Sequence, residues 1–174
     1  CGDRGGDGNI PVRVEPSVGT PADVEYRWDA DTDILSAVVH AGEGTDKPRA
    51  TALELEGADG SWLILDVRGG RIRGVEVAVW PDVHTRAELA PPADVEDGMV
   101  IVGAVEQGKR LAVEVNTRLA AEADRAERTI HFRLGASRET RTVRIARDIL
   151  VDVDRRDRIA GLWLLGVSPF PDEP

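Results

Sequence analysis

One pattern of apolar, acidic and glycine residues occurs twice in this chain. Residues 64–77 read ILDVRGGRIRGVEV, and residues 149–165 read ILVDVDRRDRIAGLWLL. The repeat matches Asp66 with Asp152, Val67 with Val153, Ile72 with Ile159 and Gly74 with Gly161. A unit of a few strands buries only one face of its sheet, whereas two copies can cover each other. The repeat therefore predicts a pseudo-twofold β-sandwich or a partly open barrel.

Apolar and polar residues alternate along most of the chain, which is typical of antiparallel β-structure. In the first half we expect strands at residues 12–15, 24–28, 34–39, 50–56, 61–67 and 72–80, separated by Gly, Pro and Asp. The one helix candidate is residues 117–127, TRLAAEADRAE, with Thr117 as its N-cap. The sequence thus predicts a mainly β protein with antiparallel sheets and at most one short helix.

The repeat and the turn residues also predict the domain organisation. We expect a flexible N-terminal tether at residues 1–9, a first β repeat at 10–83, a linker at 84–98, a second β repeat at 99–171 and a tail at 172–174. The linker contains a Pro-Pro step and shows no sustained periodicity.

The chain has 174 residues, of which 41% are hydrophobic, enough to bury a core. No apolar run approaches the roughly 20 residues that a transmembrane helix needs, so no such segment is expected. The net charge of -10 argues against nucleic acid as a partner, because both would be negatively charged. Arginines crowd residues 138–158, but acids lie among them, and we expect a self-compensating surface there.

Three acids, Asp29, Asp31 and Asp33, have the alternate spacing with which a calcium loop begins. Such a loop needs glycine at its sixth position and glutamate at its twelfth, where this chain has Ile34 and His40. Aspartate side chains also bond nearby amides in tight turns. We therefore predict a hairpin tip rather than a metal site.

The Tyr26, Asp29 and Asp33-Ile-Leu sequence, followed by residues 64–77, resembles a small bacterial domain of unknown function, family 2283. The resemblance covers residues 24–80, with a weaker echo over 111–165. Trp28 interrupts the family pattern, and the second copy lacks the tyrosine. The resemblance implies a compact, mostly β unit, used here in tandem, and assigns no catalytic residue.

Residues that could support catalysis or ligand binding are scattered in the sequence. His40, His84 and His131 lack metal-site spacing, and no Gly-x-Ser-x-Gly sequence occurs. No helix is expected after VRGGRIRG to bind a phosphate. Asp66 and Asp152 could in principle form a symmetric carboxylate pair, but we favour a structural role, in which each starts the turn that joins two long strands. We therefore predict no catalytic, cofactor-binding or metal-binding residue.

Large aromatic residues and one cysteine are the remaining candidates. Trp80, Trp163 and Phe170 would pack in the core or, if exposed beside prolines, form an interaction surface. Cys1 precedes a Gly/Asp-rich stretch, as at the mature start of a bacterial lipoprotein, so lipidation of Cys1 is one hypothesis. The alternative is that Cys1 marks only a fragment boundary.

We therefore expect a non-enzymatic protein-interaction or regulatory β module of bacterial origin. It would use no cofactor and would bind an unknown protein partner or self-associate. An alternative is a small-ligand binder or hydrolytic enzyme with a pocket between the repeats, near Asp66, Asp152, His40 and His131. A third is a cell-envelope lipoprotein anchored through Cys1, in contrast to a cytoplasmic location.

Overall fold

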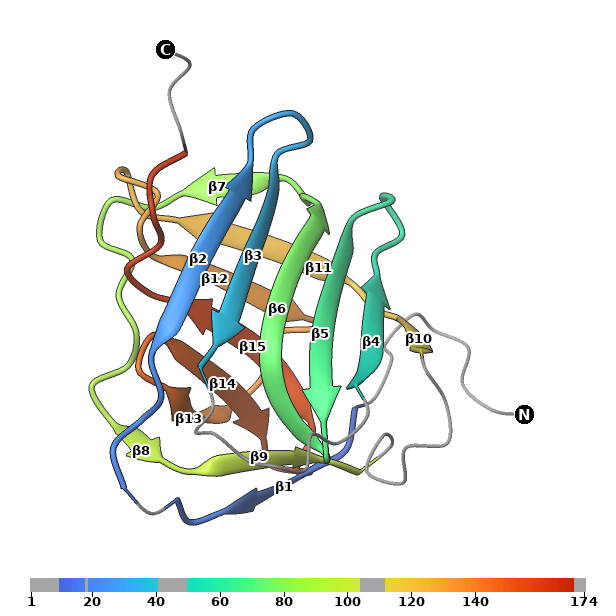
Figure 1. Ribbon diagram of the computed structural model, residues 1–174, viewed down its shortest axis with the longest axis vertical. Helices are drawn as coiled ribbons and strands as arrows, with labels where there is room; N and C mark the ends of the chain where they lie inside the picture. The colour runs from blue at the N-terminus through green and yellow to red at the C-terminus, as the bar shows by residue number, and fades with distance from the viewer. Residues whose placement is uncertain (1–9, 18, 41–49, 104–111, 171–174) are drawn as a thin grey trace.

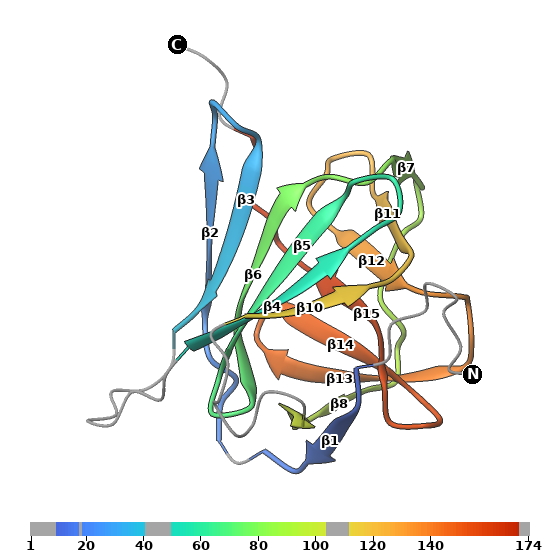
Figure 2. The same cartoon turned by 90° about the vertical axis from the view of Figure 1, so that its right-hand side faces the viewer.

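The computed structural model describes residues 10–17, 19–40, 50–103 and 112–170, and it places them in two facing β-sheets (Figure 1). The first sheet contains β1 (Val12–Glu15), β2 (Val24–Asp29), β3 (Ile34–Val39), β4 (Ala50–Glu56), β5 (Trp62–Arg68), β6 (Arg71–Val79), β9 (Met99–Val102) and β10 (Ala112–Asn116). The second contains β7 (Val83–Thr85), β8 (Val95–Asp97), β11 (Leu119–Ala123), β12 (Ile130–Leu134), β13 (Thr140–Ala146), β14 (Ile149–Asp154) and β15 (Ile159–Leu164). In Figure 2 the orange strands of the second sheet lie to the right of β2 and β3. The predicted mainly β fold, a sandwich or partly open barrel, is confirmed.

Six strands of each sheet follow the same order. The order β2-β3-β6-β5-β4-β10 in the first sheet corresponds to β11-β12-β15-β14-β13-β8 in the second. In both series, four antiparallel pairings are followed by one parallel pairing at the β10 or β8 end. β1 and β9 extend the first sheet from β6, and β7 adds an edge to the second.

The residues matched by the sequence repeat occupy equivalent places in these two series. Asp66 lies opposite Gly74 across the β5–β6 pair, and Asp152 lies opposite Gly161 across the β14–β15 pair. In each pair the register shifts immediately after the aspartate, as in a β-bulge. The two Asp–Gly pairs therefore mark the same position in the two sheets.

The core lies between the sheets and consists mainly of aliphatic side chains from alternate strand positions. Its largest fully buried members are Phe132, Ile10, Leu35, Leu53, Leu55, Leu63, Leu65, Ile149, Ile159, Leu162 and Leu164. Burying one such side chain contributes about 1.5–3 kcal/mol relative to leaving it exposed. The apolar side chains at alternate positions of each strand therefore stabilise the contact between the sheets.

The second sheet is also covered on its outer face. β7 and β8 lie at opposite edges of this sheet, both parallel to the strands they pair with, so residues 86–94 must cross the sheet between them. Since the core fills the inner side, the crossing segment (residues 86–94) runs along the outer face, as the green trace at the left of Figure 1. Leu150 and Trp163 point to this outer side, yet they are only 0% and 5% exposed.

The predicted helix at residues 117–127 is wrong. This stretch forms β11, which pairs with β12 and β7, followed by a turn in which Glu127 has φ of 58°. Pairing on both sides satisfies the backbone of β11, and burial of Ala121 and Ala123 suits a period of two. Thr117 caps no helix and is buried. Tertiary pairing therefore overrides the helix propensity of the alanines and glutamates.

The other predicted elements can be compared with the strands directly. All six strands expected in the first half lie within one residue of β1 to β6 at both ends. The expected linker at 84–98 contains most of β7 and all of β8. The tether at 1–9, which includes Cys1, and the tail at 172–174 lie outside the described residues. In the described part of the chain, no helix has the length and apolar character needed to cross a membrane.

The predicted hairpin tip is confirmed between β2 and β3. The amide of Asp31 donates to Oδ1 of Asp29 over 3.0 Å, and the amide of Asp33 donates to the Asp29 carbonyl over 2.8 Å. Asp33 has φ of 59°, a conformation that aspartate tolerates better than a β-branched residue. Among the residues that the structure describes, no group of three or more His, Cys, Asp or Glu side chains is placed to hold a metal ion.

Candidate functional site

A shallow hollow of about 320 Å³ lies on the outer face of the first sheet, which we call the open face. It is lined by Ser36, Ala37, Val38, Ala52, Ile64, Asp66, Arg73, Gly74, Val75 and Glu76, from β3, β4, β5 and β6. The apolar side chain of Val38 is 40% exposed. The open face is turned towards the viewer in Figure 1, and no described segment crosses it. No part of the chain that the structure describes therefore covers the hollow.

The hollow arises because small residues occupy the outward positions of neighbouring strands. Ser36 lies opposite Glu76, and Ala52 lies opposite Asp66. Gly74 lies between Val38 and Asp66, and a Cβ atom there would meet the Ala37 carbonyl oxygen at 3.2 Å. These small residues on β3, β6 and β4 leave a depression that longer side chains surround.

The rim of the hollow is mostly acidic on one side. Glu76, Glu54 and Glu114 lie in one row across the sheet, with Ile64 between the first two and Glu54 directly opposite Glu114. Among the described residues, none of these glutamates forms an ion pair or side-chain hydrogen bond, unlike Glu25, Glu122 and Glu139 elsewhere. Like charges directly opposite one another destabilise a sheet, so a bound cation would relieve repulsion along this row.

A smaller basic group lies at the other side of the hollow, near the β5–β6 turn. Arg68 contacts Asp66, with a distance of 3.6 Å from Nε to Oδ2. Burial, followed by the nearby charges of Arg71 and Arg68, lowers the pKa of Arg73. The hollow is therefore bounded by both signs of charge, with the unpaired acids along one row.

The equivalent place on the second sheet is filled by the protein's own side chains. The rings of His131 and Trp163 stack with centroids 4.0 Å apart and planes inclined by 14°. Asp152 Oδ2 lies 2.8 Å from His131 Nε2, and Asp152 Oδ1 accepts hydrogen bonds from Thr142 Oγ1 at 2.8 Å and Trp163 Nε1 at 3.3 Å. Gly161 makes room for this cluster, because a Cβ atom there would lie 2.7 Å from Asp152 Oδ2.

This cluster has the form of a satisfied buried network. Both carboxylate oxygens of Asp152 are engaged, and Thr142 donates to the carboxylate and not to His131. Nucleophilic catalysis needs the hydroxyl within hydrogen-bond reach of its base, which this arrangement does not provide. Buried polar groups of this kind fix the positions of neighbouring strands when every member is paired.

The structure brings together only two of the four residues predicted to surround a pocket between the repeats. His131 and Asp152 are in contact, but both belong to the outer side of the second sheet. Asp66 lies in the hollow of the open face, and His40 follows β3, where its Nε2 is 3.6 Å from Glu25 Oε2. Because aliphatic core fills the space between the sheets, the four residues do not line one pocket there.

The three aromatic residues predicted as an interaction surface do not lie together. Trp80 and Phe170 both contact Trp28, with ring centroids 5.8 and 5.2 Å away, and Phe170 is 39% exposed. Trp80 also contacts Phe132 in the core, at 5.9 Å. Trp163 lies on the other side of the second sheet and is buried, so it cannot belong to an exposed surface with the other two.

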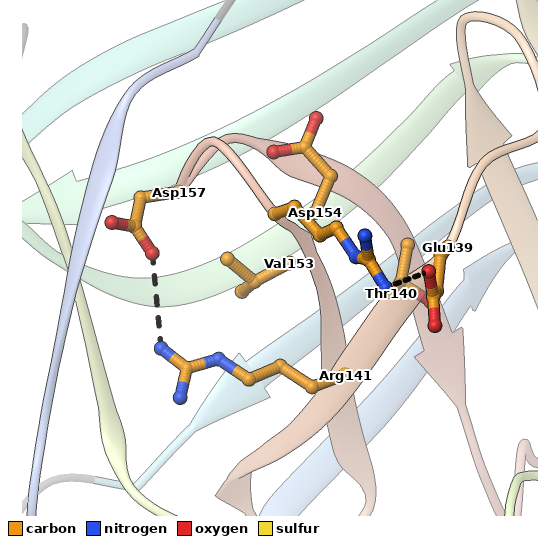
Figure 3. A pocket seen from close by; sticks show the side chains of 7 residues that line it. Glu139, Thr140, Arg141, Val153, Asp154 and Asp157 are labelled. Atoms are coloured by element: carbon orange, nitrogen blue, oxygen red, sulfur yellow. Dashed lines mark ion pairs between the residues drawn. The ribbon is translucent and has the colours of Figure 1, made fainter.

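A second pocket, of about 300 Å³, lies beside the β14–β15 turn (Figure 3). In Figure 3 the side chains of Arg141 and Asp157 point towards each other, 3.8 Å apart, and Glu139 forms an ion pair with Arg155. Arg141 also lies 3.3 Å from Glu96. The predicted self-compensating surface is confirmed for these pairs, which leave little uncompensated charge to attract a ligand.

Asp154, at the same turn, is 5% exposed and is held by several donors. Its Oδ2 accepts from Arg138 Nε at 2.7 Å and Arg158 Nε at 3.0 Å, and its Oδ1 accepts from the amides of Arg156 and Arg158. Burial acts to raise the pKa of this carboxyl, but the Arg138 hydrogen bond and the two amides outweigh it and lower the pKa.

This lowered pKa predicts how stability depends on pH. The charged carboxylate stabilises the folded state above the unfolded pKa, which is about 3.9, and that contribution disappears as pH falls through the folded pKa. The difference in unfolding free energy between the wild type and Asp154→Asn should therefore narrow from pH 6 to about pH 3. Urea unfolding of both proteins across this pH range tests the prediction. A difference in unfolding free energy that stays constant with pH would contradict it.

Sequence reasoning missed both the hollow and the way Asp152 is paired. The repeat had matched Asp66 with Asp152, but the small residues Ser36 and Ala52 carry no pattern that singles them out. No protein-family profile matches the chain, and no similar sequence was found among curated proteins. The resemblance to family 2283 therefore stays a prediction.

Proposed function

We propose that this protein is a non-enzymatic interaction module that binds a protein partner on its open face. The observation that supports this proposal is the contrast between the two sheets. One outer face is filled by stacked rings and crossed by residues 86–94, whereas the other leaves a hollow beside an exposed Val38. A hollow with an apolar floor and a charged rim is typical of an interaction site.

We further propose that β2 to β6 and β11 to β15 derive from one duplicated β unit, in line with the family 2283 resemblance. The shared order of six strands and the equivalent Asp–Gly pairs support this. β9 and β10, which fall within the predicted second repeat (residues 99–171), lie in the first sheet. In this interpretation one copy closed its outer face with Trp163 and the crossing segment, while the other kept its face open. Stability and binding would then be divided between the two copies.

Photo-cross-linking in the native host tests the proposed function. A photoreactive amino acid replaces Val38, and in a matched control it replaces Val83, which is 42% exposed on β7 of the other sheet. We expect a cross-linked partner from position 38 and none from position 83. The purified partner should then bind Val38→Asp at least about tenfold more weakly than the wild type.

Two outcomes would overturn this proposal. Equal cross-linking from both positions would show that exposure alone, and not the hollow, determines contact. Cross-links found only between two copies of this chain would show that the open face mediates self-association and does not bind a separate partner.

A further inference from the structure

The second sheet shows how this fold covers the place that the hollow occupies on the first. There, an indole ring lies in the outward row and its N–H donates to an aspartate, and residues 86–94 cross the same outer face. The crossing segment reads RAELAPPAD, with two prolines, and its Leu89 and Pro91 are half-buried. The protein therefore contains its own example of a closed face.

The corresponding positions on the open face lack these groups. Register places Glu76 where the second sheet has Trp163, and Ser36 where it has His131. Ala52 takes the place of Thr142. Asp66 is retained in the place of Asp152, but without the threonine and indole donors. The open face thus has the aspartate acceptor, but it has no aromatic ring to fill the space beside that acceptor.

We propose that the hollow receives an aromatic side chain from an extended, basic segment of the partner. This inference rests on the proposed function and specifies the partner's chemistry. The ring lies over Val38 and Ile64, where a tryptophan or tyrosine donates a hydrogen bond to Asp66. Lysine or arginine residues beside the ring lie along the row of Glu76, Glu54 and Glu114.

Size and charge both favour this occupant. The hollow's volume of about 320 Å³ is at the lower end of the roughly 300–1,000 Å³ found for ligand sites, so it suits one large side chain. Aromatic residues in fitted pockets dominate the energy of many interfaces. The unpaired glutamates and the net charge of -10 attract cationic segments and repel nucleic acid.

Short synthetic peptides test this inference without knowledge of the partner. Fluorescein-labelled KKPWPKK is compared by fluorescence anisotropy with KKPAPKK and EEPWPEE, at about 20 mM and about 150 mM salt. We expect KKPWPKK to bind at least about tenfold more tightly than either analogue, and more weakly at the higher salt. Equal binding of KKPAPKK would overturn the inference, because charge alone would then explain the affinity.

Variants of the protein locate the bound peptide. Ala52→Leu fills the hollow and Glu54→Lys reverses one charge of the row, so each should weaken KKPWPKK binding by about tenfold. Glu88→Lys makes the same charge change on the crossing segment, on the other side of the molecule, and should leave the affinity within about twofold. Unchanged affinity in Ala52→Leu, with the wild-type fold shown by circular dichroism, would overturn the inference.

The two proposals can fail separately. If position 38 cross-links a partner but the peptides do not show the predicted order of affinities, the inference of an aromatic, basic segment is wrong. The proposal that the open face binds a partner is then still supported. If position 38 captures no partner, the proposed function is wrong, whatever the peptides do.

Discussion

Replacement of Gly161 by alanine is expected to destabilise the protein by about 3–5 kcal/mol. The added Cβ atom would lie 2.6 Å from the carbonyl oxygen of Phe132, a backbone atom that the pairing of β12 with β15 holds in place. It would also lie 2.7 Å from Asp152 Oδ2, which bonds His131. Overpacking of this kind costs about 1–3 kcal/mol, and loss of the charged hydrogen bond adds about 1.5–3 kcal/mol.

The equivalent glycine of the first sheet is the matched control. A Cβ atom at Gly74 would lie 3.2 Å from the Ala37 carbonyl oxygen and 3.4 Å from Asp66 Cβ, so small shifts suffice. We expect Gly74→Ala to change stability by about 1 kcal/mol or less. Thermal unfolding measures both variants, and Gly161→Ala should lower the Tm by roughly 10 °C. Equal shifts in the two variants would show that the cluster around Asp152 is not close-packed.

Replacement of Asp154 by asparagine is expected to cost about 2–4 kcal/mol at neutral pH. The variant keeps the size of the side chain but removes the charge that Arg138 and Arg158 both contact. Two partly buried guanidinium groups would then face a neutral amide, and one of the acceptor oxygens becomes a donor. Urea unfolding at pH 7 measures the loss.

Glu139→Gln is the control for this second prediction. Glu139 pairs with Arg155 close to the same turn, but both side chains are largely exposed. Exposed pairs contribute about 0–1 kcal/mol, so this variant should unfold close to the wild type. A loss in Glu139→Gln as large as that in Asp154→Asn would indicate that net charge, and not the buried contacts of Asp154, controls stability here.

The internal repeat could be used to predict equivalent positions, but not what each position does. The sequence pattern matched Asp66 with Asp152, and in the structure Asp66 lies opposite Gly74 and Asp152 lies opposite Gly161. Their surroundings differ because the residues on neighbouring strands differ, and those strands are distant in the sequence. The contact between His131 and Asp152 spans 21 residues and depends on β15 lying between β12 and β14.

The amino-acid sequence alone determined where most strands of the first half begin and end. Alternation and turn residues act over a few positions, so β1, β3 and β4 were predicted at their observed bounds. The tertiary structure decided that residues 119–123 form a strand and that residues 86–94 cross one sheet. It also decided that a hollow remains on the other sheet. These features depend on which strands become neighbours, and a non-local pairing leaves little trace in the local pattern of either partner.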